Sequence, residues 1–81
     1  MDNLTISNIK QIETVYRGFD LIITEIKTAE NVEFWYHVKG YGIARLSYRI
    51  SALDYKKLHC GRLPLDNILD YINYDELEKE R

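Results

Sequence analysis

The chain has 81 residues and a formal net charge of −2 at neutral pH; 46% of its residues are hydrophobic and 30% are charged. This balance excludes an intrinsically disordered chain and fits one small globular domain. The longest unbroken apolar run, Leu21–Ile23, is far shorter than a membrane span. The single cysteine, Cys60, excludes an intrachain disulfide, as is usual in a reducing compartment. Because the first residues also lack the apolar run of a secretion signal, we expect a cytoplasmic protein with no membrane segment.

The charges are unevenly distributed along the chain. Residues 34–62 contain six basic side chains and one acidic side chain, whereas residues 1–33 carry a net charge of −3 and residues 63–81 a net charge of −4. The basic middle segment has two interpretations. Either the acidic ends neutralise it within the fold, or it forms a patch that binds an anionic partner.

Residues 1–18 form an N-terminal segment whose hydrophobic pattern fits two structures. Leu4 and Ile6 alternate as in a strand, whereas Ile6, Ile9 and Ile12 recur at the spacing of a helix. We therefore expect either a strand or a short helix that covers the sheet.

Residues 19–50 are predicted to form an antiparallel β-meander, with three strands, or four if the N-terminal segment joins it. Strand-forming residues occupy 19–27 and 32–50, and turn residues occupy 28–31 and 40–42. Pairing across the first turn joins residues whose numbers sum to 59, and pairing across the second joins residues whose numbers sum to 82.

These two registers predict one apolar face that forms the core. The predicted core pairs are Leu21–Val38, Ile23–Tyr36, Val38–Ala44, Tyr36–Leu46, Phe34–Tyr48 and Val32–Ile50. The predicted pairs on the opposite face are His37–Arg45, Trp35–Ser47 and Glu33–Arg49. The last of these pairs joins opposite charges, which favours the register.

The face opposite the predicted core carries aromatic rings and positive charge, and it is the candidate binding surface. The candidate partner-binding residues are Trp35, His37, Lys39, Tyr41, Arg45 and Arg49. Trp35 is the expected anchor, and the two arginines are expected to donate charge-assisted hydrogen bonds. Tyr41 is included because it lies at the tip of a turn between two glycines. Ile22 and Ile26 of the first strand lie on the same face, so it is not purely polar.

Residues 51–78 are predicted to form two short helices after the meander. Ser51 is a favourable N-cap for the first helix, and Gly61 suits the position just after its C-terminus. Pro64 suits the start of the second helix, in which apolar residues recur at helical spacing. Residues 79–81 are expected to be a frayed tail. The fold class predicted from these features is a single small α+β domain.

The sequence contains no motif for catalysis, for metal binding or for cofactor binding. His37, His59 and Cys60 lack the paired spacing of a zinc site. Asp66 and Asp70 share one face of a predicted helix, opposite its apolar stripe, where a solvated surface explains them. We therefore expect a protein that is not an enzyme and that uses neither a metal nor a cofactor.

The primary functional hypothesis is a non-catalytic binding protein that occludes a surface of a nucleic-acid-handling enzyme. By its size and its lack of catalytic residues the chain resembles the small anti-defence proteins of phages and mobile elements, such as anti-CRISPR and anti-restriction proteins. That resemblance implies inhibition of a host enzyme. Two alternatives stay open: a module that binds single-stranded nucleic acid on the cationic, aromatic face, and a structural homodimer through that face. The residues expected to form the homodimer are Ile22, Ile26, Ile43 and Trp35.

Overall fold

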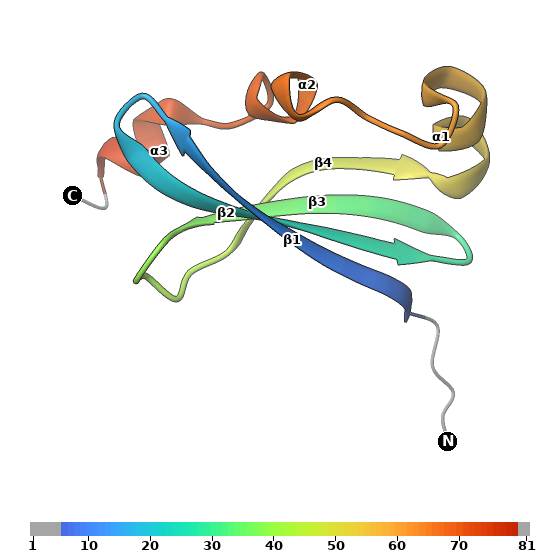
Figure 1. Ribbon diagram of the computed structural model, residues 1–81, viewed down its shortest axis with the longest axis horizontal. Helices are drawn as coiled ribbons and strands as arrows, with labels where there is room; N and C mark the ends of the chain where they lie inside the picture. The colour runs from blue at the N-terminus through green and yellow to red at the C-terminus, as the bar shows by residue number, and fades with distance from the viewer. Residues whose placement is uncertain (1–5, 80–81) are drawn as a thin grey trace.

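The computed structural model describes residues 6–79 and shows one four-stranded antiparallel sheet followed by helices (Figure 1). The strands are β1 (Ile6–Tyr16), β2 (Phe19–Thr28), β3 (Asn31–Val38) and β4 (Arg45–Ser51), adjacent in chain order. The helices are α1 (Ala52–His59), α2 (Leu65–Leu69) and α3 (Tyr74–Glu78). The predicted α+β class is confirmed, with three short helices in place of the two expected. The predictions for residues 1–5 and for 80–81 of the tail lie outside the described residues.

The first hairpin decides between the two interpretations of the N-terminal segment. Arg17 and Gly18 both have positive φ, 49° and 87°, which gives the two-residue turn of the type I′ class. This turn places Tyr16 opposite Phe19 and pairs the two longest strands of the sheet over almost their whole length. Residues 6–16 are therefore a strand, because a tight turn of this class returns the chain directly along β2.

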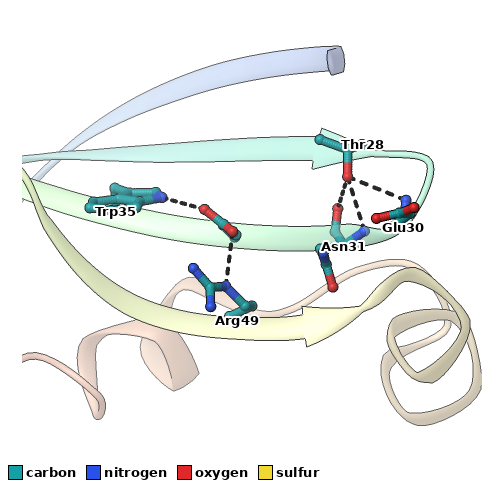
Figure 2. Close-up of polar contacts among 6 residues, drawn as sticks. Thr28, Glu30, Asn31, Trp35 and Arg49 are labelled. Carbon is teal, nitrogen blue, oxygen red and sulfur yellow. Dashed lines mark hydrogen bonds and ion pairs between the residues drawn. The ribbon is translucent and has the colours of Figure 1, made fainter. Parts of the chain in front are cut away.

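The second hairpin follows the predicted register. Leu21 lies opposite Val38 and Ile23 opposite Tyr36, as the sum of 59 requires. The Thr28 hydroxyl stabilises the turn: it accepts hydrogen bonds from the backbone N–H groups of Glu30 (3.3 Å) and Asn31 (3.0 Å), as Figure 2 shows. A threonine at the end of a strand thus satisfies turn donors that have no partner in the sheet ladder.

The register predicted for the third hairpin holds at one end and fails at the other. The pairs Val32–Ile50, Glu33–Arg49 and Phe34–Tyr48 form as predicted. Between Phe34 and Trp35 the register shifts, so Trp35 lies opposite Leu46. The predicted pair Trp35–Ser47 is therefore wrong.

The shift is a β-bulge, and it reverses the faces of the residues that precede it in β4. Tyr36 lies opposite Arg45 and not opposite Leu46, and the predicted His37–Arg45 pair does not form. The predicted Val38–Ala44 pair is also absent from the described ladder, because β4 begins at Arg45. Ser47 is the extra residue, and its hydroxyl donates to the Ile68 carbonyl at 3.2 Å. This contact with α2 is compatible with the bulge alone, because the unshifted register would place Ser47 on the side away from the helices.

The core lies between the sheet and the three helices, which lie along one side of the sheet in Figure 1. From the sheet, the buried side chains are Phe19, Leu21, Ile23, Val32, Phe34, Tyr36 and Val38. From the helical half, they are Tyr55, Leu63, Ile68, Ile72 and Leu77. Leu46 and Ala44, predicted for this core, are exposed because the bulge and the preceding loop remove them from it.

The first helix lies where the sequence predicts, between Ser51 and Gly61, and the second begins after Pro64 as predicted but ends earlier. The Ser51 side chain accepts a hydrogen bond from the Asp54 N–H at 3.1 Å, which caps α1. Pro64 precedes α2, and the Asn73 side chain caps α3 by accepting from the Glu76 N–H. A new cap at Asn73 divides the second predicted helix into two.

Candidate interaction surface

The side of the sheet opposite the helices, here named the open face, is built by alternate residues of all four strands. On β3, Val32, Phe34, Tyr36 and Val38 are buried toward the helices, so the residues between them point to the other side. Cross-strand partners share a face, which extends the assignment to the neighbouring strands. The apolar members are Ile9, Val15, Ile22, Ile26, Trp35 and Leu46. The polar members include Gln11, Glu13, Asp20, Thr24, Glu33, His37 and Arg49.

A carboxylate on the open face holds the tryptophan and an arginine together. The Trp35 indole N–H donates to Glu33 Oε1 at 2.8 Å, and Arg49 Nε donates to Glu33 Oε2 at 2.9 Å (Figure 2). Glu33 and Trp35 are two residues apart on one strand, and Arg49 lies opposite Glu33, so the backbone itself brings the three groups together. The polar atom of the indole is therefore satisfied within the fold, and the ring surface is left for apolar contact.

Two further ion pairs neutralise basic residues of the middle segment. Lys39 Nζ lies 3.2 Å from Glu13 Oε1 of β1, and Arg45 lies 3.4 Å from Glu76 Oε1 of α3. With Arg49–Glu33, they pair three of the six basic side chains of residues 34–62. Such exposed pairs contribute little stability, but each one cancels positive charge locally. For these three side chains the structure supports neutralisation within the fold.

The structure brings together only part of the predicted site. Trp35, His37 and Arg49 share the open face, and Lys39 follows them at the end of β3. Arg45 lies on the opposite face, because the bulge places it beside buried Tyr36 and within reach of α3.

The remaining candidate, Tyr41, lies in the loop between β3 and β4. It is 50% exposed, and its backbone N–H donates to the Val38 carbonyl. The exposed ring is thus held at the end of the sheet and lies outside the set of paired positions that forms the open face.

Three apolar members of the open face were missed by the sequence reasoning. Ile9 and Val15 come from β1 and are 56% and 66% exposed, and Leu46 is 39% exposed beside Trp35. The Arg17–Gly18 dipeptide is the signal that could have found the first two, because glycine in a two-residue turn indicates a hairpin. The open face is therefore more apolar than the sequence indicated.

A second aromatic group lies on the helix side. The Tyr48 and Tyr71 rings are stacked with centroids 4.6 Å apart, and His59 contacts Tyr48 edge-on. Burial raises the pKa of Tyr48, and the nearby Tyr71 and Asp54 raise it further. Burial likewise raises the pKa of Tyr55, with a second contribution from the Glu25 carboxylate. Both phenols stay protonated at neutral pH, which suits structural hydroxyls and does not suit general bases.

Within residues 6–79, no group of three or more His, Cys, Asp or Glu side chains is placed to hold a metal ion. None of the described helices has the length and apolar character required to cross a bilayer. The chain matches no protein-family model, no curated protein and no solved structure.

Proposed function

We propose that this is a non-catalytic binding protein whose open face occupies the surface of a protein partner. The observation that supports this proposal best is that Trp35 lies beside exposed Leu46 on the open face, while Glu33 holds both the Trp35 indole N–H and Arg49. Protein interfaces combine an apolar centre, often with a tryptophan anchor, and a periphery of satisfied polar groups. Ile9, Val15 and Leu46 add exposed apolar side chains to this face, and apolar side chains gathered on one face of a small domain favour an interaction site.

A protein partner fits this face better than a nucleic acid does. Binding to phosphates relies on Lys and Arg side chains that are available to replace counterions. On the open face, Arg49 is held by Glu33, and neighbouring Lys39 is held by Glu13. A nucleic acid would have to displace both carboxylates and then lie beside them. Single-stranded nucleic-acid binding is therefore the second candidate.

The partner class that we propose is a nucleic-acid-handling enzyme, inhibited by occlusion in the cytoplasm. The helical half supports this choice, since it presents the exposed acids Asp66, Asp70, Asp75 and Glu78. An enzyme groove that holds DNA or RNA is lined by cations and attracts such a surface. Because the helices lie on the side of the sheet opposite the open face, these acids attract the enzyme at long range during its approach, and the open face alone makes the apolar contact. In size and lack of catalytic residues the chain resembles phage and mobile-element anti-defence proteins, which often act by blocking a host enzyme.

The experiment measures cleavage of a labelled DNA by a panel of restriction endonucleases and RNA-guided nucleases with and without the protein. We expect inhibition of at least one enzyme. Trp35→Ala should weaken that inhibition by about 30-fold, the loss typical of an interface anchor. Leu46→Ala should weaken it less, because the side chain is smaller and lies beside the anchor.

The matched control is Leu58→Ala, which removes a 70% exposed leucine from α1 on the helix side of the sheet. It should leave inhibition unchanged. Thermal unfolding of each variant verifies that the fold is intact. Inhibition that survives Trp35→Ala and Leu46→Ala but is lost with Leu58→Ala would place the binding surface on the helices and refute the proposal.

A further inference from the structure

The edge of the sheet formed by β1 is unusually long and has no partner in the described chain. β1 spans 11 residues, is the terminal strand of the sheet, and within residues 6–79 it pairs with β2 alone. An exposed edge strand presents a row of backbone donors and acceptors that can pair with another strand.

The type I′ turn determines which residues of β1 present those groups. In a two-residue hairpin the residues flanking the turn, Tyr16 and Phe19, exchange both backbone hydrogen bonds, and the bonding alternates from there. The even-numbered residues from 10 to 16 therefore bond to β2. The backbone groups that point away from the sheet belong to Ile9, Gln11, Glu13 and Val15. The Lys39 N–H bond to the Asp20 carbonyl (2.8 Å) agrees with this alternation, since it directs Asp20 toward β3.

The exposed side chains of β1 match those of a second, antiparallel copy in one register. A two-fold axis at Ile12 places Ile9 opposite Val15 of the second copy, and the two Ile12 side chains opposite each other. These three residues are the exposed large hydrophobic side chains of β1 in the described chain, at 56%, 39% and 66% exposure for Ile9, Ile12 and Val15. Each of them therefore acquires an apolar cross-strand neighbour.

The neighbouring registers lose this match. An axis at Glu13 places two carboxylates directly opposite each other, which is destabilising. An axis at Gln11 places Ile9 opposite the carboxylate of Glu13 in the second copy. The axis at Ile12 instead pairs Gln11 with Glu13 and Lys10 with Thr14, which juxtaposes no like charges. The side-chain pattern of β1 thus selects one register.

We propose that two copies of this chain pair along β1 about a two-fold axis at Ile12 and form one continuous eight-stranded antiparallel sheet. Because Ile9 and Val15 belong to the open face, the two open faces lie on the same side and merge into one surface with two Trp35 rings. The helices of both copies then lie together on the other side. This assembly is independent of the partner proposed above.

The first test is the molar mass of the full chain in solution, measured by size-exclusion chromatography with light scattering over a range of concentrations. We expect a doubling of the single-chain mass of 9.6 kDa. Gln11→Pro removes an outward-pointing N–H and leaves the ladder to β2 intact, so it should return the mass to that of one chain. Gln11→Ala, which keeps this N–H, is the matched control and should remain dimeric.

The second test reads the register directly and does not depend on tolerance of proline. In a Cys60→Ser background, Ile12→Cys places two thiols at a non-hydrogen-bonded pair, where the Cα atoms lie about 4.5 Å apart, within disulfide range. Mild oxidation with diamide should convert most of the protein into a covalent dimer. Lys10→Cys is the control, because the two thiols would then lie roughly 13 Å apart along the strands and should not react.

Three outcomes would overturn the proposal. A single-chain mass at every concentration excludes the dimer. A dimer that persists in Gln11→Pro and crosslinks through neither cysteine variant excludes pairing along β1; stacking of open faces would give this result, because residues 10 and 12 lie on the helix side of the sheet. Crosslinking that favours Lys10→Cys excludes the register.

Discussion

At the scale of the residue, Glu33 determines the electrostatic character of the open face. Its carboxylate accepts from the Trp35 indole and from Arg49, so that one acid both orients the ring and cancels the nearest cation. The sequence predicted the Arg49 contact through the register. The Trp35 contact could have been predicted as well, because residues two apart on a strand share a face.

Glu33→Ala should therefore expose the cation and make the open face bind anionic polymers. We expect several-fold tighter binding of a labelled single-stranded oligonucleotide than with the wild type, falling steeply between about 50 and 200 mM salt, because released counterions drive such binding. Fluorescence anisotropy measures it. Glu30→Ala is the control, since it changes the net charge equally at a turn position with no ion pair among the described residues. Equal gains in both variants would show that net charge alone acts.

The Tyr55 hydroxyl makes two hydrogen bonds inside the fold. The residue is 4% exposed, its oxygen accepts from the buried Leu63 N–H at 3.1 Å, and it donates to Glu25 Oε2. Tyr55→Phe should lower the free energy of unfolding by about 1–2 kcal/mol, because the Leu63 N–H loses its acceptor. Urea unfolding at neutral pH measures this loss, and a variant as stable as the wild type would contradict it.

The raised pKa of Tyr55 also predicts how stability depends on pH. Burial, followed by the Glu25 charge, favours the neutral phenol in the folded state. The stability it contributes is therefore complete below the unfolded pKa near 10 and is lost as pH rises through the higher folded value. Tyr48 shifts in the same direction. Unfolding measurements across the alkaline range should show a shallower decline for Tyr55→Phe than for the wild type.

At the scale of the element, the two hairpins around β3 show what sequence reasoning can and cannot resolve. The β2–β3 register followed from alternation and from a short turn whose ends are well defined. The β3–β4 register failed because Ile43, Ala44 and Leu46 place apolar side chains at both odd and even positions, so that either register satisfies the pattern. The Ser47 contact with α2, 21 residues away in the sequence, favours the shifted register and cannot be seen from the hairpin's own pattern.

The placement of each candidate site residue was predicted correctly only where the register of its strand was predicted correctly. Trp35, His37 and Arg49 lie on one face as expected. Trp35 and His37 alternate along β3, and Arg49 belongs to the part of β4 whose register was predicted correctly. The prediction placed Arg45 on the wrong face, because it did not include the bulge. The contribution of β1 was missed because a segment with both strand-like and helix-like spacing has no preferred period of its own.

At the scale of the whole molecule, residues 6–79 form a two-layer domain in which one face of the sheet has no second layer. The helices and the buried residues lie on one side of the sheet. Within the described residues no helix or strand covers the other side. Domains of this size bury a modest share of their surface and gain stability from partners. An apolar open face and a free edge strand are the two places where this chain can acquire one.

The measurement that tests the central claim most directly uses Trp35, the only tryptophan in the chain. Its indole N–H gives a single resonance in the spectrum of the nitrogen-15-labelled protein, and this resonance reports on the open face, where the indole lies. Titration with an inhibited enzyme from the cleavage panel should shift or broaden this resonance in proportion to inhibition. Complete inhibition with an unchanged indole resonance would contradict the assignment of the open face as the binding surface.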